Sequence, residues 1–142
     1  VIRPGDALAD REKARQARTM WAAWQCATYA EFAEQESEQL RLFNLGYAEG
    51  TKFLHALLND EITKEEYSSE VPVGVSLRLG GPSADFMLGN IFAGASEDAH
   101  DTVTARDAHG LRLDPKDYVT DTEMQSIIAR GKFNDGNCEL LR

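Results

Sequence analysis

Apolar residues recur at helical spacing near the start of the chain. No Gly or Pro interrupts the sequence between Asp10 and Ala33, and the apolar positions follow the i, i+3, i+4 spacing of one helix face. The residues of this stripe are Met20, Trp21, Trp24, Ala27, Thr28 and Phe32. The pattern predicts a helix over residues 10–33, preceded by an extended lead-in over residues 1–9, where the periodicity is missing.

A second helix is predicted from Ser37, which is a suitable N-cap, to about Asn59. One continuous long helix is the alternative, because no helix breaker separates the two segments. The apolar face of this segment contains Phe43, Gly46, Tyr47, Gly50, Phe53, Leu54 and Leu57.

The two glycines on that face indicate a close approach. Each Gly in a helix interior costs about 1 kcal/mol relative to Ala. Gly46 and Gly50 lie one helical turn apart, which favours a partner helix that packs closely against them. A ligand groove bordered by Tyr47 and Phe53 is the alternative interpretation.

Patterns in the middle of the chain are less regular. Thr63 and Glu66 form a capping-box pair, which predicts a helical turn. Residues 71–79 alternate between apolar and other positions, as in a strand. No second strand signal exists for pairing, and Pro72 suits the first turn of a helix. We therefore expect a short helix here, with a lone hairpin as the alternative.

A Gly-rich break at residues 80–83 precedes a third long helix. Ser83 at the cap and Asp85 in the first turn are typical of a helix start. The small-residue face of this helix contains Phe86, Gly89, Asn90, Ala93, Ala95 and Ala99.

The last quarter is predicted to form a loop over residues 107–119 and a final helix. Thr120 and Glu123 form a second capping-box pair, and Gly131 is expected to end the helix. The elements add up to one all-α domain over residues 1–142. It should have about four main helices in bundle-like packing, with short accessory helical turns.

Two cysteines, Cys26 and Cys138, lie near the two ends of the fold, and neither belongs to a C-x-x-C motif. A disulfide between them would be worth roughly 4–5 kcal/mol in the chain-entropy model. It would also tie down the short C-terminal tail, residues 135–142. These arguments favour a bridge and an oxidising compartment, and two inert core thiols are the alternative.

The charge balance disfavours polyanionic partners. The 142 residues carry 15 Lys and Arg against 24 Asp and Glu, a net charge of −9. The basic cluster is Arg11, Lys13, Arg15 and Arg18. Asp10 and Glu12 are interleaved with it, as on an exposed helix face. We expect neither nucleic acid nor an anionic membrane surface as a partner.

No apolar run is long enough to predict a membrane span. The chain begins at Val1 rather than Met. That start fits an exported chain whose signal peptide has been removed, and it fits a trimmed chain equally well.

Glu97 and His100 form the best metal-like pair, because E-x-x-H places a carboxylate and an imidazole on one helix face. Di-iron bundles use that spacing twice, whereas this chain has one copy, so an ordinary surface contact is favoured. The alternative is a metal-dependent enzyme that adds a carboxylate such as Glu49. We expect no metal and no cofactor.

Four aspartates could supply oxygen ligands to calcium: Asp107, Asp114, Asp117 and Asp121. Their spacing departs from that of a calcium-binding loop, so turns and caps are the favoured interpretation. The chain has no G-x-S-x-G, P-loop or H-E-x-x-H motif, and neither cysteine has an adjacent His. No residue is predicted to be catalytic.

An irregular Gly-rich segment meets a helix start at Gly81, Ser83 and Asp85. Free N–H groups there could bind an anion or a partner's carboxylate. The favoured interpretation is that the segment only ends one element and begins the next helix. With Tyr47 and Phe53, these residues form the candidate surface for a partner or ligand.

Several short motifs, taken together, carry a resemblance. They are Cys26 in a Trp-containing helix, Gly46-Tyr47-Ala48-Glu49-Gly50, Gly81-Pro82-Ser83-Ala84-Asp85-Phe86 and Asn137-Cys138. In their order the chain resembles small uncharacterised exported bacterial helical proteins. The resemblance covers about a fifth of the chain, implies export and a Cys26–Cys138 bridge, and adds no catalytic residue.

These observations lead to an expected function. We expect a periplasmic or secreted, non-catalytic helical protein that binds a protein partner, such as an inhibitor, an immunity-type protein or an accessory subunit. Its acidic side chains would suit a basic partner surface. A structural subunit of an assembly is a further alternative, and the sequence leaves the oligomeric state open.

Overall fold

The computed structural model describes the backbone of residues 4–142 and the side chains from residue 11 onward. The elements in this part are α1 (Pro4–Phe32), α2 (Glu36–Leu58), α3 (Lys64–Glu70), α4 (Val73–Ser76), α5 (Ala84–Thr104), η1 (Pro115–Asp117), α6 (Thr122–Asp135) and η2 (Cys138–Leu140). Residues 4–142 contain no strand, and their β pairing is limited to an isolated bridge between Arg106 and Arg112. The predicted all-α class is confirmed.

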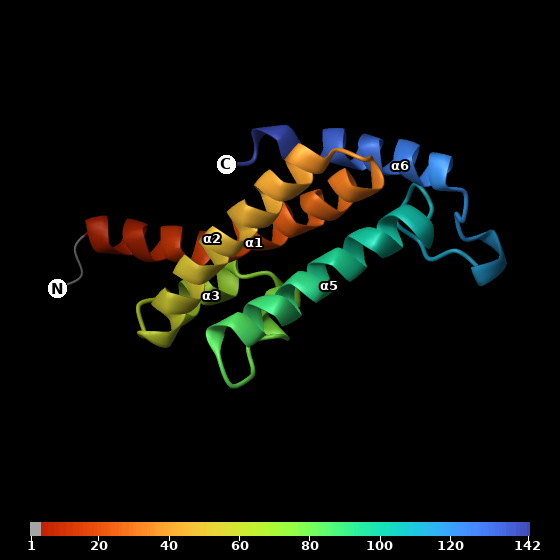
Figure 1. Ribbon diagram of the computed structural model, residues 1–142. Coiled ribbons are helices and arrows are strands. Elements are labelled where there is room, and N and C mark those ends of the chain that lie inside the picture. Colours follow the sequence, from red (N-terminus) through yellow and green to blue (C-terminus); the bar gives the residue numbers. More distant parts are fainter. Residues whose placement is uncertain (1–3) are drawn as a thin grey trace.

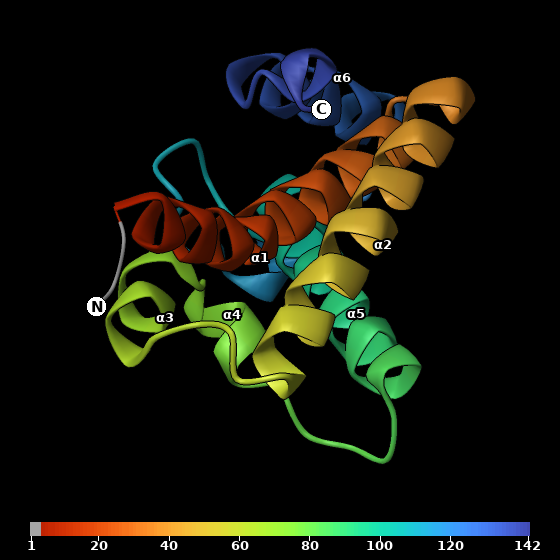
Figure 2. The same cartoon turned by 90° about the vertical axis from the view of Figure 1, so that its left-hand side faces the viewer.

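The helix α1 is at the centre of the fold (Figure 1, Figure 2). Each of the other α-helices packs against α1, whereas α2 and α5 contact each other over a much shorter stretch. The last helix, α6, lies along the C-terminal half of α1. The short helices α3 and α4 pack at the opposite end, as Figure 2 shows. Four main helices with short accessory turns are therefore present, as expected.

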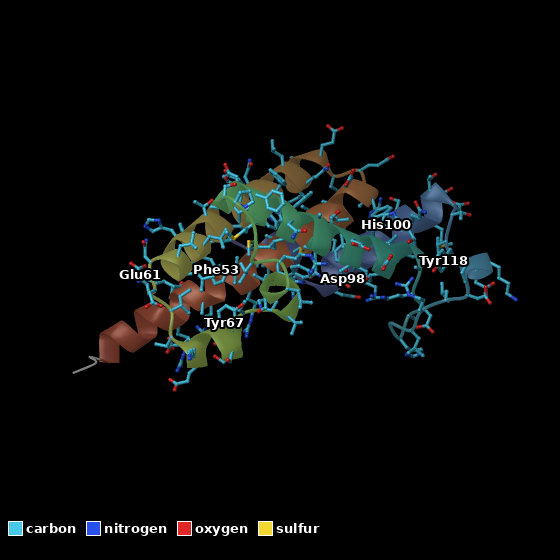
Figure 3. The ribbon with its side chains drawn as sticks, turned by 90° about the horizontal axis from the view of Figure 1, so that it is seen from below. Phe53, Glu61, Tyr67, Asp98, His100 and Tyr118 are labelled. Carbon is cyan, nitrogen blue, oxygen red and sulfur yellow. A yellow bond between two sulfur atoms is a disulfide. The ribbon has the colours of Figure 1, made fainter. Side chains whose placement is uncertain are left out.

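Two clusters form the buried core. The larger cluster joins α1, the second half of α2, α4 and α5, and its largest buried side chains include Trp24, Phe53 and Met20. The smaller cluster contains Cys26, Ala27, Ala30, Leu42, Phe133 and Cys138. Figure 3 shows Phe53 toward one end of the molecule and His100 toward the other.

Close packing explains the two glycines of α2, as predicted. A Cβ at Gly46 would lie 2.4 Å from Nε1 of Trp24, and one at Gly50 would lie 2.5 Å from Sδ of Met20. Both neighbours belong to α1 and are fully or almost fully buried. The glycines therefore let the backbone of α2 approach the large side chains of α1.

Two predictions for the first two helices are wrong. Helix α1 begins at Pro4, so the extended lead-in over residues 1–9 does not hold from Pro4 onward, and residues 1–3 lie outside the described part. Proline is well suited to a helix start because its fixed φ is helical and its missing N–H is not needed there. The Ser37 cap is also wrong, because α2 begins at Glu36 and Gln35 occupies the N-cap position without a side-chain cap hydrogen bond. The alternative of one continuous helix is excluded, because α1 ends at Phe32 and Glu34 has a φ of 59°.

The two middle cap predictions are confirmed. The Thr63 hydroxyl accepts a hydrogen bond from the Glu66 N–H at 3.2 Å, and the Ser83 hydroxyl accepts one from Phe86 N–H at 3.1 Å. The segment 71–79 contains the expected short helix, which is α4.

The last helix differs from its prediction at both ends. Asp121, not Thr120, is its N-cap, and its carboxylate accepts a hydrogen bond from Met124 N–H at 3.0 Å. Gly131 does not end the helix, which continues to Asp135. A single Gly costs only about 1 kcal/mol, and Phe133, which is 4% exposed, packs into the core and holds the extra turn.

The C-terminal tail is fixed by two kinds of contact. Cys26 and Cys138 form a disulfide, with their Cα atoms 5.7 Å apart. The guanidinium of Arg41 donates hydrogen bonds to the backbone oxygens of Leu141 and Cys138 at 2.6 and 3.1 Å. The tail is therefore tied to α1 by a covalent bond and to α2 by a charged side chain.

Candidate functional site

A groove runs along α1 with α5 on one side, while the other side is formed by α2 in its first two hollows and by the α1–α2 turn and α6 in its third. It consists of three adjoining hollows with volumes of about 160, 380 and 390 Å³. Phe43 and Phe92 line both the first and the second hollow, and Thr28 and Glu31 line both the second and the third. Because the hollows share walls, we treat them as one site, the α2–α5 groove.

One face of α5 forms a wall of this groove. Besides Leu88, the α5 residues that line the groove are Asp85, Gly89, Phe92, Ser96 and His100. They follow the i, i+4, i+7, i+11, i+15 spacing of one helix face. From Asp85 to His100 this wall is about 22 Å long at helical rise. A Cβ at Gly89 would meet no atom within 4 Å, so the wall leaves open space there.

In the first two hollows the facing wall is the first half of α2. Its lining residues are Glu36, Gln39, Leu40, Phe43 and Tyr47. The apolar members are unusually accessible, since Leu40 is 62%, Tyr47 45% and Phe43 38% exposed. Clustered exposed apolar side chains of this kind mark interaction surfaces more often than isolated ones do.

Three aromatic rings form the floor and connect the three helices. Phe92 of α5 meets Trp24 of α1 and Phe43 of α2 edge to face, with centroid distances of 5.5 and 5.3 Å. Trp24 is 1% exposed, and its indole N–H donates a hydrogen bond to the backbone oxygen of Phe43 at 3.1 Å. The floor is therefore an apolar surface of three touching rings, and the indole N–H of Trp24 already has a hydrogen-bond partner.

The lining is acidic. Glu31, Glu34, Glu36 and Asp85 contribute carboxylates, and among the described lining residues there is no Lys or Arg. Glu31, Glu34 and Glu36 are exposed, and none of the three forms an ion pair with any described side chain. Their charge is therefore directed at solvent near the turn that joins α1 and α2.

At the opposite end, Tyr47 of α2 and Asp85 of α5 span the groove. The phenol of Tyr47 donates a hydrogen bond to the Asp85 carboxylate at 3.0 Å. This bond, together with the negative charge of Asp85, raises the pKa of Tyr47 above its ordinary value near 10. Because the pKa is raised, the stabilisation from this bond is present at neutral pH and is lost as the pH rises through the folded-state value.

Asp85→Ala should lower the pKa of Tyr47 toward that of a free tyrosine, because both the hydrogen bond and the adjacent charge disappear. NMR of ring-labelled tyrosine, followed through an alkaline titration, measures this pKa directly. Asp117→Ala, which removes a carboxylate outside the groove, is the control. An unchanged Tyr47 titration in Asp85→Ala would show that the two side chains do not interact.

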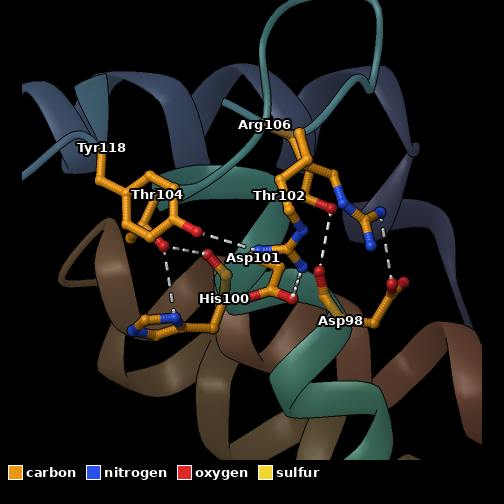
Figure 4. A network of polar contacts seen from close by, with 8 residues as sticks. Asp98, His100, Asp101, Thr102, Thr104, Arg106 and Tyr118 are labelled. Carbon is orange, nitrogen blue, oxygen red and sulfur yellow. Dashed lines mark hydrogen bonds and ion pairs between the residues drawn. The ribbon is translucent and has the colours of Figure 1, made fainter. Parts of the chain in front are cut away.

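At the other end of the groove, His100 lies beside α6. Its ring packs on Phe32 at a centroid distance of 5.3 Å, and its Nδ1 lies 3.4 Å from the hydroxyl of Thr104 (Figure 4). Thr122 and Gln125 of α6 line this hollow as well. The C-terminal helix therefore forms part of the site.

A polar network holds the end of α5 in place behind this hollow. Asp98 accepts a hydrogen bond from Gln25 of α1 at 2.7 Å. It also forms an ion pair with Arg106 at 3.5 Å (Figure 4). Asp101 pairs with Arg112 of the following loop at 2.9 Å. These contacts position His100 through its own helix.

The structure brings only part of the predicted partner surface together. Tyr47 and Asp85 meet across the groove, but Phe53 is fully buried in the larger core cluster, so its assignment to a surface is wrong. Ser83 is occupied as the N-cap of α5. Gly81 has a φ of 142° and packs against the Phe86 ring. It therefore belongs to the chain break before α5, which is the interpretation that the sequence favoured.

The metal-like pair is not assembled into a site. His100 lines the α2–α5 groove, whereas Glu97 lines a separate hollow beside Trp21 and Arg78. Glu49 pairs with Lys52 at 3.1 Å. Among the described residues, no group of three or more His, Cys, Asp or Glu side chains is placed to hold a metal ion.

The aspartates of the loop act mainly in turns and caps, as favoured. Asp114 caps η1 and Asp121 caps α6. Asp107 accepts hydrogen bonds from the backbone N–H groups of Leu111 and His109, and these bonds hold its pKa below the ordinary value.

Among the lining residues that sequence reasoning missed are Leu40, Phe92 and Ser96, and also the three glutamates Glu31, Glu34 and Glu36. The signal for Phe92 and Ser96 was the run of small residues along α5, which leaves space beside the larger side chains. For Leu40 the signal was weaker, since its position outside the predicted stripe of α2 indicated only exposure. Leu40 can be recognised as a lining residue only when the position of α5 opposite it is known.

Comparison with known proteins finds no matching family model, no matching curated protein and no matching solved structure. None of the helices in the described part of the chain is both long enough and apolar enough to cross a membrane.

Proposed function

We propose that this chain is a non-catalytic binding protein that holds a segment of a protein partner in the α2–α5 groove. One observation carries the proposal: an open trough about 22 Å long at helical rise presents the half-exposed side chains of Leu40, Phe43 and Tyr47. A small ligand is normally enclosed on most sides, whereas an elongated open groove suits a polypeptide segment.

The polar groups of the groove support binding rather than covalent chemistry. Ser96 and His100 line the same hollow, but the hydroxyl of Ser96 accepts a hydrogen bond from Thr28 at 3.1 Å, and Nδ1 of His100 faces Thr104. Among the described residues no hydrogen bond joins Ser96 to His100. A nucleophile needs such contact with its base, so this pair lacks the arrangement of an activated serine.

The compartment belongs to the same proposal. The disulfide between Cys26 and Cys138 is compatible with an oxidising environment. We assign the protein to the periplasm or the extracellular space, where its partner would also be found.

Photo-cross-linking in the source cells tests this function. Leu40 and Leu58 form a matched pair, because both lie on α2 and both are 62% exposed, while only Leu40 lines the groove. A photoreactive residue at position 40 should yield a discrete cross-linked protein, and the same residue at position 58 should not.

Blocking the groove provides the second half of this test. Gly89 and Gly131 both have open space around the Cβ position, but only Gly89 lines the groove. Gly89→Trp should abolish the cross-link from position 40, and Gly131→Trp should preserve it. Equal products from positions 40 and 58, or a product that survives Gly89→Trp, would contradict binding in the groove.

A further inference from the structure

We propose that the occupant of the α2–α5 groove is an amphipathic α-helix of the partner, with a cluster of basic residues at one end. This inference rests on the proposed function and names the chemistry of the partner. The apolar face of that helix would lie on the aromatic floor, and its basic end would lie beside the turn between α1 and α2.

The shape of the groove favours a helix over an extended strand. Its floor and both walls are helices, and the lining residues of α5 repeat at helical spacing along about 22 Å. An incoming helix would complete a four-helix arrangement with α1, α2 and α5. A segment that binds by strand addition would need a sheet edge, and residues 4–142 offer no strand.

The apolar anchors fit the same geometry. Leu40, Phe43 and Tyr47 are spaced i, i+3, i+7 along α2, which is the spacing that a facing helix matches with its own i, i+3, i+4, i+7 side chains. Gly89 leaves room opposite them for a large side chain of the partner.

The charge of the lining selects a basic partner. The described lining carries four carboxylates and no Lys or Arg, and the whole chain has a net charge of −9. An acidic segment would place like charges next to Glu31 and Glu36, whereas Lys or Arg would pair with them.

The charges are also distributed unevenly, and this sets the orientation. Glu31, Glu34 and Glu36 gather near the α1–α2 turn and are free of ion pairs with described side chains. At the far end, Asp85 already accepts a hydrogen bond from Tyr47. The basic end of the partner helix should therefore lie near Glu31 and the apolar end near Tyr47.

Cross-link mapping tests the helical conformation. Photoreactive residues at positions 40 and 47 lie seven residues apart on α2, about 10 Å along its axis. If the partner segment is helical, the two sites it cross-links should be about seven residues apart, against about three for an extended segment. Position 40 should map to the more basic end.

Charge reversal tests the basic end. A synthetic peptide of the cross-linked segment should bind the purified protein, and Glu31→Lys with Glu36→Lys should weaken binding on the order of tenfold. Glu65→Lys with Glu139→Lys, which changes the net charge equally at exposed positions outside the groove, should leave the affinity nearly unchanged. A circular dichroism spectrum of each variant confirms that its helices are retained.

The outcomes separate the two levels of the proposal. A partner that cross-links at position 40 through an acidic segment, or through sites about three residues apart, overturns the basic helix and leaves the proposed function standing. A product at twice the mass of this chain overturns the basic helix in favour of a second copy. No product at position 40 overturns both.

Discussion

The double substitution Cys26→Ala and Cys138→Ala is expected to lower the free energy of unfolding by roughly 4–5 kcal/mol. The disulfide joins positions 112 residues apart, so its loss releases nearly the whole chain in the unfolded state. Both side chains are buried, and Ala leaves no polar group at either position. Urea unfolding followed by circular dichroism measures the change.

A chemical control requires no substitution. Wild-type protein unfolded in the presence of a reductant should show nearly the same loss of stability as the double variant. If oxidised and reduced protein unfold at the same urea concentration, the bridge does not stabilise the fold.

Loss of the bridge should also affect the groove. The smaller core cluster, which holds α6 against α1, consists mostly of small side chains apart from Leu42 and Phe133. Thr122 and Gln125 of the same helix line the end of the groove. The disulfide therefore links the stability of the C-terminal region to the shape of the proposed binding site.

Local chemistry made much of the fold predictable from the sequence. The caps at Thr63 and Ser83 depend on side chains three residues away, and both were predicted correctly. Prediction failed where two local solutions compete. Thr120 and Asp121 are adjacent candidates for one cap, and the structure uses Asp121, whose carboxylate is the stronger acceptor.

Burial was harder to predict because it depends on which helices meet. Phe43 and Phe53 fall on the same predicted face of α2, yet Phe53 is fully buried while Phe43 is 38% exposed. Phe53 lies inside the larger core cluster, which residues of α4 and α5 complete, whereas Phe43 touches Phe92 of α5 with one side of its ring and lines an open hollow with the other. Helical spacing cannot distinguish these two positions, because the difference depends on which residues of the other helices cover each ring.

The candidate site was also hard to predict, because it depends on which helices meet. Tyr47 and Asp85 were singled out from separate motifs, and their contact depends on how α2 and α5 pack against α1. The groove itself comes from three helices distant in sequence, so no local pattern contains it. The sequence does contain two features that the groove requires. They are the glycines at the α1–α2 contact and the small residues along α5.

Gly46→Ala is expected to destabilise the protein by about 1–3 kcal/mol, although Ala is the better helix former. The new methyl group would lie 2.4 Å from Nε1 of Trp24. That ring is 1% exposed and is held by its hydrogen bond to the Phe43 backbone, so it cannot move aside without cost. Thermal unfolding followed by circular dichroism measures the effect.

Gly131→Ala is the matched control, because a Cβ at this α6 position meets no atom within 4 Å. It should stabilise the protein by about 0.5–1 kcal/mol through helix propensity alone. The same substitution in two helices should thus change stability in opposite directions. If both variants were stabilised, the contact between Trp24 and Gly46 would be looser than described. Because Trp24 also supports Phe92 in the groove floor, Gly46→Ala should weaken partner binding as well.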